Sequence, residues 1–267
     1  MGIDPSAQIH PSAVIEQGAN VGPDCHIGPF CVVGSEVTLG ARVTLKSHVV
    51  VTGWTDLGDD STVFPFANIG DVPQDLKYGG ERTRLIVGKR NRIREGVTMN
   101  TGTEGGGGIT KVGDDGLFMA GAHVAHDAQV GDRVIMANNS AVAGHCVISD
   151  DVIIGGLSGV HQFVRIGRGA IIGAVTMVTH DVIPYGLVQG PRGGLDGLNL
   201  VGLKRRGVAR EDIMALRAAF QALAQGEGAF QDRARRLQDD EAGQSPYVRE
   251  IVSFVLGDSD RSFLTPG

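Results

Sequence analysis

The sequence predicts a mainly β fold in which short parallel strands stack as a three-sided coil, followed by a small α-helical domain. Three observations lead to this prediction. Aliphatic residues recur every six positions over most of the chain before Pro184. Glycine supplies 41 of the 267 residues, about twice its usual share of ~7%. Apolar residues at helical spacing occur only towards the C-terminus.

The first run of repeats begins at Ile3. Twelve aliphatic residues stand at strict six-residue spacing: Ile3, Ile9, Ile15, Val21, Ile27, Val33, Leu39, Leu45, Val51, Leu57, Val63 and Ile69. A period of six suits neither an α-helix nor an isolated hairpin, but it suits a coil with three short sides and eighteen residues per turn. We therefore predict four coils here, each pairing as parallel β-structure with its neighbours.

Two segments without the repeat, 71–84 and 101–111, interrupt the coil. Hexads resume at Val87, and a second run of twelve begins at Val112. Insertions in a solenoid must leave it as external loops, and such loops usually carry function. Residues 74–78 of the first loop mix both charges with an aromatic ring, so we expect them to touch substrate.

The coil should end near Pro184, which takes the place of the next inward aliphatic residue. Residues 185–199 are rich in glycine, and we expect a crossing loop there. Apolar spacing beyond it predicts three helices, the last capped by Ser245 and Pro246, at residues 211–223, 230–237 and 246–255. The chain would then divide into a coil domain, 1–190, and a helical domain, 191–267.

Charge and cysteine content exclude several classes of protein. The formal net charge of −6 does not indicate a basic surface that would bind nucleic acid. No run approaches the roughly 18–20 apolar residues of a membrane span, and the N-terminus has no secretory signal, so we expect a cytoplasmic protein without membrane insertion. The three cysteines each lie four residues after an inward aliphatic residue, which predicts small, buried, free thiols at Cys25, Cys31 and Cys146.

Histidines collect on one face of the second run. His126, His145 and His161 follow, by two, three and one positions, the inward residues Val124, Val142 and Val160. These valines are eighteen apart and should stack in successive coils, one strand spacing of ~4.8 Å each. We therefore expect the three imidazoles to line up beside one another.

His126 and Asp127 are the best candidates for a general base and the carboxylate that holds its tautomer. No serine or cysteine lies in a recognisable nucleophile motif. The predicted chemistry is therefore direct attack by a substrate hydroxyl, without a covalent enzyme intermediate. Gly144 lies one coil further along, where a backbone N–H could face a developing oxyanion.

Eight segments resemble the UDP-N-acetylglucosamine O-acyltransferase family of lipid A synthesis. They are His26–Phe30, Leu45–Val51, Gln74–Tyr78, Arg90–Glu95, Ala122–Asp127, Ala143–His145, Val160–Phe163 and Gly202–Gly207. The resemblance covers most of the chain and implies a left-handed parallel β-helix of hexapeptide repeats. The left hand comes only from this resemblance, because parallel crossovers are generally right-handed.

The resemblance also implies a reaction. A homotrimer would transfer an (R)-3-hydroxyacyl chain from the phosphopantetheine of acyl carrier protein to the glucosamine 3-hydroxyl of UDP-N-acetylglucosamine, with no other cofactor and no metal. His126 would be the general base, Asp127 would orient it, and the Gly144 amide would lie near the thioester oxyanion. Residues that would hold the substrates are Asp75, Lys77, His123, His145, His161, Gln162, Asn199, Arg205 and Arg206.

Three residues depart from the family's pattern. Val201 stands where a glutamate is expected in the nucleotide-binding stretch, and Arg192 replaces a histidine in the loop associated with the acyl tail. Ala174 occupies a turn where a glycine accompanies longer acyl chains. Its methyl group could displace the last carbons, each worth ~0.8 kcal/mol of burial. We therefore expect a preference for a chain somewhat shorter than fourteen carbons.

Three rival hypotheses remain. The related N-acyltransferase of the same pathway carries a uridine-binding domain before its repeats, whereas the repeat here starts at Ile3. A non-catalytic solenoid would need neither aligned histidines nor two polar insertions. A zinc-dependent hydratase on the same coil could take its ligands from His123, His126, His145 and His161.

Overall fold

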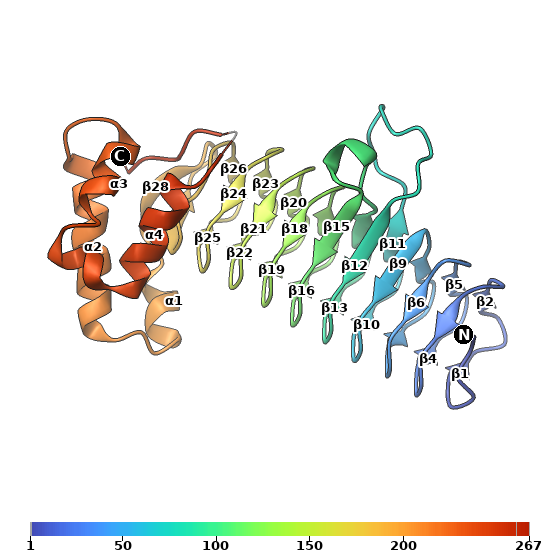
Figure 1. The fold of residues 1–267 in the computed structure, drawn as a ribbon. Helices are drawn as coiled ribbons and strands as arrows, with labels where there is room; N and C mark the ends of the chain where they lie inside the picture. The colour runs from blue at the N-terminus through green and yellow to red at the C-terminus, as the bar shows by residue number, and fades with distance from the viewer. Residues whose placement is uncertain (1, 260, 267) are drawn as a thin grey trace.

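The computed structural model describes residues 2–259 and 261–266, which form a long three-sided coil followed by a cluster of helices (Figure 1). Each side of the coil is one sheet, and we name the sides faces A, B and C. The chain moves from one face to the next at every corner, so most strands pair in parallel with the strands three before and three after them. The predicted parallel coil is confirmed.

The three faces differ in the number of their strands. Face A has eight: β3 (Asn20–Val21), β6 (Thr38–Leu39), β9 (Trp54–Leu57), β12 (Arg84–Val87), β15 (Ile109–Val112), β18 (Gln129–Val130), β21 (Val147–Ile148) and β24 (Arg165–Ile166). Face B has eleven: β1 (Gln8–Ile9), β4 (His26–Ile27), β7 (Thr44–Leu45), β10 (Thr62–Val63), β13 (Arg92–Ile93), β16 (Leu117–Phe118), β19 (Ile135–Met136), β22 (Ile153–Ile154), β25 (Ile171–Ile172), β27 (Gly186–Gln189) and β28 (Gly194–Leu198). Face C has nine: β2 (Val14–Ile15), β5 (Val32–Val33), β8 (Val50–Val51), β11 (Asn68–Asp71), β14 (Thr98–Asn100), β17 (His123–Val124), β20 (Ala141–Val142), β23 (Gly159–Val160) and β26 (Met177–Val178).

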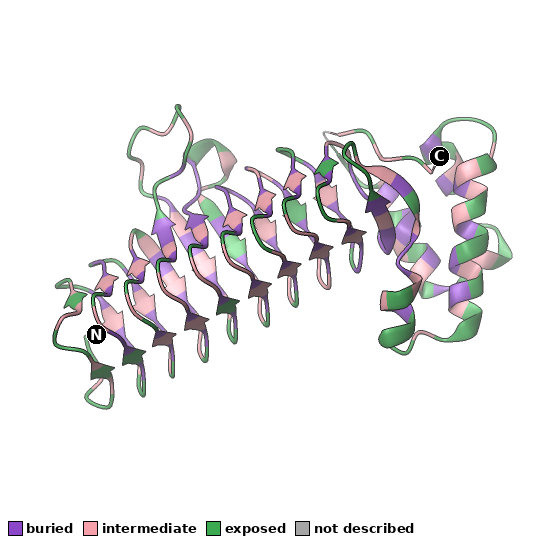
Figure 2. Ribbon diagram, turned by 180° about the vertical axis from the view of Figure 1, so that it is seen from behind, coloured by how far each residue is buried: buried purple, intermediate pink, exposed green. Residues whose placement is uncertain are grey.

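The interior of the coil is a narrow column of mostly aliphatic side chains. Figure 2 shows that buried residues recur in the strands along the coil. In each short strand the second residue points inward, as the six-residue period predicts. The predicted register is confirmed, because Val124 pairs with Val142 and Val142 pairs with Val160. The thiols predicted beside this column are free and buried, at Cys25, Cys31 and Cys146.

At most corners of the coil one residue position, which we call the corner slot, has a left-handed backbone. At the corner between faces C and A this slot holds Asp127, His145 and Phe163, whose φ angles are 60°, 61° and 65°. Such angles cost non-glycine residues roughly 1–2 kcal/mol, so the coil geometry around them must enforce the conformation. Because these residues are eighteen apart in the chain, they lie in successive coils.

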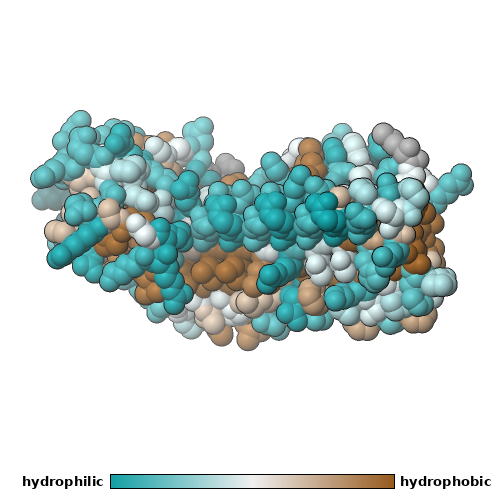
Figure 3. Space-filling model, turned by 90° about the horizontal axis from the view of Figure 1, so that it is seen from below, coloured by the Kyte–Doolittle hydropathy of each residue, from teal (hydrophilic) through white to brown (hydrophobic). Residues whose placement is uncertain are grey.

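The outer surfaces of the three faces differ in polarity. Outward residues of face A are mostly polar or charged, with Val147 an exposed exception. Face B instead presents a row of apolar, half-buried side chains towards its C-terminal end: Leu117, Ile135, Ile153, Ile171 and Leu187. Figure 3 shows an apolar band along the coil next to a row of hydrophilic side chains. Face B is therefore a candidate contact surface.

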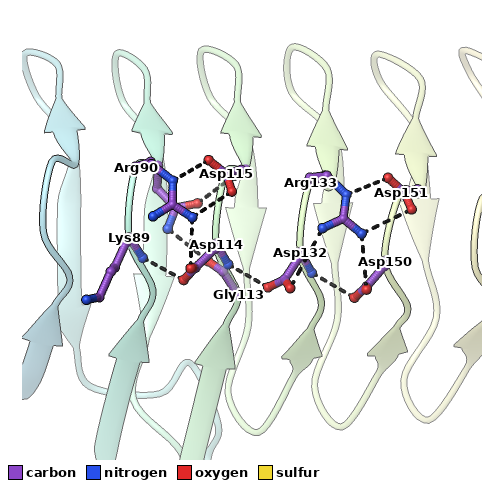
Figure 4. Close-up of polar contacts among 11 residues, drawn as sticks. Lys89, Arg90, Gly113, Asp114, Asp115, Asp132, Arg133, Asp150 and Asp151 are labelled. Carbon is purple, nitrogen blue, oxygen red and sulfur yellow. Dashed lines mark hydrogen bonds and ion pairs between the residues drawn. The ribbon is translucent and has the colours of Figure 1, made fainter. Parts of the chain in front are cut away.

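The corner between faces A and B carries a ladder of opposite charges (Figure 4). Arg90 pairs with Asp115 at 2.7 Å, and Arg133 pairs with Asp151 at 2.8 Å. Aspartates in the neighbouring slot accept hydrogen bonds from backbone N–H groups of the preceding coil, as Asp132 does from Asp114 at 2.8 Å. The ladder therefore satisfies corner amides that no strand pairing reaches.

Both insertions leave the coil on the same side (Figure 1). The first spans residues 72–83, between β11 and β12. The second spans residues 101–108 and includes the short 3₁₀ helix η1 (Glu104–Gly106). It is shorter than the predicted loop 101–111, because β15 already begins at Ile109.

The prediction of a loop over residues 185–199 is wrong. Strands β27 and β28 form an antiparallel hairpin there, and β27 also pairs in parallel with β25. Pro184 therefore ends the regular hexads without ending face B. The hairpin extends the sheet as far as Leu198.

The three predicted helices are confirmed, and two further elements accompany them. The predicted ones are α2 (Arg210–Gln225), α3 (Phe230–Arg236) and α4 (Pro246–Leu256); the others are α1 (Leu200–Arg205) and the 3₁₀ helix η2 (Glu241–Gln244). Ser245 occupies the N-cap position of α4, but its hydroxyl donates to Asp212 instead of capping the helix. Across the described residues, no helix has the length and apolarity needed to cross a bilayer.

Candidate active site

The centre of the site is a buried His126–Asp127 pair at the corner that follows β17. The Nδ1 atom of His126 lies 2.8 Å from Oδ2 of Asp127, and the two side chains are only 6% and 1% exposed. An ionised carboxylate can only accept, so Nδ1 carries the proton and Nε2 of His126 is left with a free lone pair. In this tautomer Nε2 of His126 can accept a proton or a hydrogen bond from a ligand.

The second insertion holds Asp127 in place. The backbone N–H of Thr103 donates to Oδ1 of Asp127 at 2.8 Å, and the Thr103 hydroxyl donates to Oδ2 at 2.6 Å. The loop can come this close because of Gly106, where a Cβ atom would overlap the Asp127 carboxylate. We did not predict the role of Thr103, because no repeat or motif marks a glycine-rich loop as covering a carboxylate one coil away.

His145 adds a second imidazole to the site. Its ring centroid lies 5.0 Å from that of His126, with the rings nearly perpendicular, and its Nδ1 atom is 3.8 Å from Oδ2 of Asp127. The ring stacked on His145, at 4.5 Å and parallel, belongs to Phe163. The predicted alignment of three imidazoles is therefore confirmed for His126 and His145 and wrong for His161.

The corner slot explains this correction. Asp127, His145 and Phe163 share the left-handed position of three successive coils, whereas His161 lies two residues before that position. Stacking therefore follows the corner slot and not the distance from the inward valine. The same eighteen-residue spacing, applied from His145, would have found Phe163 in the sequence.

Gly144 lies against the His126 ring. A Cβ atom at residue 144 would overlap the His126 imidazole, so glycine is needed here for space. Among the described residues we find no acceptor for the buried Gly144 N–H. This amide is therefore available to a ligand beside the imidazole.

A cleft of about 550 Å³ opens beside these residues. His145 and Phe163 form its coil side, the first insertion contributes Asp75, Lys77 and Tyr78, and the second contributes Thr103 and its neighbours. Arg82 fixes the base of the first insertion, because its guanidinium group lies 4.1 Å from the Trp54 ring and 2.8 Å from Glu36. The structure thus brings Asp75 and Lys77 into the same cleft as His145 within a single chain.

Comparison with known proteins decides the family. A family model described as "Udp N-acetylglucosamine O-acyltransferase; Domain 2" matches residues 181–264, and the bacterial transferase hexapeptide model matches residues 18–53. The acyl-[acyl-carrier-protein]–UDP-N-acetylglucosamine O-acyltransferase of Paracoccus denitrificans is 70% identical over 204 residues, which cover 76% of this chain and 77% of that protein. The chain belongs to this O-acyltransferase family. It is an acyltransferase.

Other relatives agree with this assignment. The Rhizobium etli protein of the same name is 50% identical over 82% of this chain and 80% of its own length. The solved structure of the UDP-N-acetylglucosamine acyltransferase from Campylobacter jejuni superposes with a TM-score of 0.91 at 36% identity, covering 97% of this chain and 100% of that one. This likeness confirms the predicted fold class, a left-handed parallel β-helix with C-terminal helices.

Two histidines of this O-acyltransferase have pKa values below the usual value for histidine. Burial lowers the pKa of His123, and the nearby His126 lowers it further; its Nδ1 atom lies 2.7 Å from the Thr98 hydroxyl. Burial also lowers the pKa of His145, although the Asp127 carboxylate acts in the opposite direction. Burial therefore favours the neutral form of both rings beside the His126–Asp127 pair.

The remaining predicted site residues do not line this cleft. His161 and Gln162 are exposed at the same corner as Phe163. Asn199 is buried and caps α1, accepting from the N–H of Gly202 and donating to the Gly169 carbonyl, both at 2.9 Å. The C-terminal end of α1 carries two exposed side chains, Arg205 and Arg206.

The residues that differ from the family pattern lie at the far end of the coil. Ala174 is exposed in the turn before β26, and Arg192 is exposed in the β27–β28 turn, where its backbone pairs with Met177. Both therefore lie near β26. Val201 is 61% exposed on α1.

One group in the described part of the chain could hold a metal ion. Ligand atoms of His126, Asp127 and His145 all lie within 4.8 Å of one another. Both oxygens of Asp127 already accept hydrogen bonds from Thr103, and Oδ2 also lies beside His126 Nδ1. The carboxylate is therefore arranged to orient an imidazole, and a metal would have to displace those bonds.

Proposed function

We propose that the protein transfers an (R)-3-hydroxyacyl chain from acyl carrier protein to the glucosamine 3-hydroxyl of UDP-N-acetylglucosamine, the first step of lipid A biosynthesis. The observation that carries this proposal is the buried His126–Asp127 pair, 2.8 Å apart, beside a cleft that also contains Lys77. The names of the relatives support the choice of substrates, and the geometry of the pair supports His126 as the general base.

In the proposed mechanism Nε2 of His126 takes the proton of the sugar hydroxyl as its oxygen attacks the thioester carbonyl carbon. Asp127 stabilises the imidazolium that forms, because its carboxylate faces Nδ1. The Gly144 N–H donates to the tetrahedral oxyanion. Collapse of this intermediate breaks the carbon–sulfur bond, and the phosphopantetheine thiolate receives the proton from His126. No covalent enzyme intermediate and no cofactor take part.

The loop residues and the neutral histidines would hold the sugar nucleotide and the acyl chain. Lys77 offers a cation to the diphosphate, and Asp75 offers an acceptor to a sugar hydroxyl. His123, His145, His161 and Gln162 line the same corner region and can donate hydrogen bonds. Arg205, Arg206 and Asn199, which lie outside the cleft of their own protomer, would serve the nucleotide across a subunit contact.

We propose a homotrimer as the assembly that creates this contact. Face A is mostly polar on its outer surface, whereas face B has a row of apolar side chains that a single protomer leaves half-buried. Three copies with face A outward would bury the apolar row of face B around a common axis. The three free, buried thiols fit a reducing compartment, and we propose the cytoplasm.

Ala174 would set the acyl length. It lies in a turn beside β26, three residues before Met177, at the far end of the coil from the first insertion. We expect its methyl group to shorten the space for the last carbons, so the optimum lies somewhat below fourteen carbons. Donors of graded length test this. An optimum at fourteen or above would defeat it, and Ala174→Gly should move the optimum towards longer chains.

The test of the function is a transfer assay with purified protein, UDP-N-acetylglucosamine and (R)-3-hydroxyacyl carrier protein, with the product's ester position assigned by mass spectrometry and NMR. We expect a 3-O-acyl sugar nucleotide and free carrier-protein thiol in equal amounts. Absence of transfer with every donor length would reject the proposal.

The group formed by His126, Asp127 and His145 keeps a zinc-dependent hydratase as the second candidate. The hydratase hypothesis predicts that activity requires zinc, whereas the acyltransferase hypothesis does not. Stoichiometric zinc in the native protein, with activity lost on chelation and restored by zinc, would favour the hydratase. Full transferase activity in excess chelator would exclude a metal role.

A further inference from the structure

The C-terminal segment returns to the coil beside the active-site corner. After α4 the chain runs back to the last coil near β26 and then turns towards the helices again (Figure 1). Phe263 pairs with Asp181 as a parallel bridge, and the N–H of Leu264 donates to the Asp181 carbonyl at 2.8 Å. The Ser259 hydroxyl donates to the buried Asp181 carboxylate at 2.6 Å. These contacts hold the segment on the coil.

Arg261 of this segment reaches His161, one hundred residues earlier in the chain. Its Nη2 atom lies 2.8 Å from Nδ1 of His161, and its Nε atom donates to the Gln162 carbonyl at 3.1 Å. Within the described residues no carboxylate forms an ion pair with Arg261. The guanidinium group therefore forms its hydrogen bonds with His161 and Gln162, the two residues that precede Phe163.

These contacts select one tautomer of the His161 ring. A guanidinium group can only donate hydrogen bonds, so Nδ1 of His161 must accept. The Gln162 carbonyl, 3.3 Å from the same Nδ1, takes its hydrogen bond from Arg261 instead. The ring proton then lies on Nε2, and because His161 is exposed this N–H can reach a ligand.

We propose that Arg261 is a positioning residue, which holds His161 as a hydrogen-bond donor for an oxygen atom of the substrate. This inference rests on the proposed acyl transfer. The oxygen belongs either to the 3-hydroxyl of the acyl chain or to the diphosphate of the sugar nucleotide, since both are acceptors. Loss of Arg261 frees the ring to rotate and to carry its proton on either nitrogen, so a smaller fraction of the enzyme has the competent donor.

The test compares Arg261→Ala with Ser262→Ala, a matched control whose side chain is exposed on the same segment. We expect Arg261→Ala to lower kcat/KM about tenfold, the order of size seen for partners that orient functional histidines. Ser262→Ala should keep the wild-type value, and both proteins should keep the wild-type unfolding midpoint. Arg261→Lys, which keeps a cationic hydrogen-bond donor without the planar fork of the guanidinium group, should restore part of the loss. A change of less than twofold in Arg261→Ala would overturn the inference.

A double-mutant cycle shows whether Arg261 acts through His161. If it does, Arg261→Ala lowers kcat/KM no further in a His161→Ala background. Additive losses would overturn the inference. An acyl donor that lacks the 3-hydroxyl then shows which oxygen His161 contacts. If it contacts the acyl hydroxyl, Arg261→Ala causes no loss with this donor. If it contacts the diphosphate, the loss persists and appears as a raised KM for the sugar nucleotide. Wild-type protein without transfer activity would reject the proposed function itself, whereas an active wild type with an unaffected Arg261→Ala rejects only this role.

Discussion

At the scale of single residues, the proposed catalytic pair depends on a carboxylate whose two oxygens both accept hydrogen bonds. Asp127 accepts from Thr103 twice and from His126 once, and its own N–H donates to the Thr110 hydroxyl at 2.7 Å. A carboxylate held in this way cannot rotate away from the imidazole. The orientation of His126 therefore comes from a loop and not from the coil alone.

Thr103→Val removes the hydroxyl while keeping the shape of the side chain. The hydrogen bond to an ionised, buried Asp127 is lost, and such bonds are worth about 1.5–3 kcal/mol. Part of this loss should appear in the transition state, so we expect kcat to fall about tenfold with little change in KM. Steady-state kinetics check this. A raised KM at constant kcat would show that Thr103 holds substrate instead.

The lowered pKa values of His123 and His145 predict how the stability of the protein depends on pH. Both have a lowered pKa in the folded protein, whereas the unfolded chain titrates near 6.5. Below that value the unfolded state binds more protons, so the free energy of unfolding decreases as the pH falls from 6.5 towards the folded pKa. The effect is absent above pH 7.5, where both states are neutral.

Urea denaturation between pH 5.5 and 7.5 measures this effect. We expect His123→Gln to lose less stability on acidification than the wild type, by at most about 1.4 kcal/mol per pH unit. His10→Gln, at an exposed position of the first coil, should follow the wild-type curve. Parallel curves for His123→Gln and the wild type would contradict the prediction.

At the scale of elements, the second insertion is a lid over Asp127, and Gly106 is one of the glycines that its fit depends on. Gly106 leaves no room for a Cβ atom beside the Asp127 carboxylate, whereas a Cβ atom on Gly105 would meet nothing within 4 Å. Neither residue needs a left-handed backbone. The two positions differ in the room that they leave for a Cβ atom, so substitutions at them form a matched pair.

Gly106→Ala should therefore destabilise the protein by about 1–3 kcal/mol, the usual cost of overpacking a closed site. Gly105→Ala should change the free energy of unfolding by less than about 0.5 kcal/mol. Thermal and urea denaturation of the two variants give the comparison. Equal stabilities would show that the lid does not rest on Asp127 in solution.

The elements also show what a sequence with this repeat can and cannot predict. Six-residue spacing was enough to place the inward residues and their register, because each hexad repeats one backbone geometry. It did not predict the β27–β28 hairpin, whose strands pair antiparallel after Pro184 breaks the period. It also missed Thr103 and Arg261, because loop and tail contacts follow no period. Phe163 obeys the eighteen-residue spacing and could have been found.

At the scale of the whole molecule, the coil is a prism with unequal sides. The A–B corner carries the charge ladder and face A is mostly polar, whereas face B ends in a row of isoleucine and leucine side chains. Such a row is expected to be covered in solution. The proposed trimer would cover it and would bring the α1 arginines of one protomer towards the cleft of another.

Ile153→Glu places a charge in the apolar row of face B and should dissociate the trimer into protomers. Val147→Glu is the matched control, since Val147 is an outward apolar residue of the same coil but lies on face A and is 41% exposed. Sedimentation velocity should show a trimer for Val147→Glu and a smaller species for Ile153→Glu. Dissociation of both variants, or of neither, would contradict the proposed packing.

The most direct test of the catalytic role is the turnover of His126→Ala in acyl transfer, measured at saturating UDP-N-acetylglucosamine and acyl carrier protein with the trimer intact. A positioned general base contributes typically 10²–10⁴-fold, so kcat should fall by at least about a hundredfold while the unfolding transition stays cooperative. A folded His126→Ala protein that retains kcat within about threefold of the wild type would show that another group removes the proton.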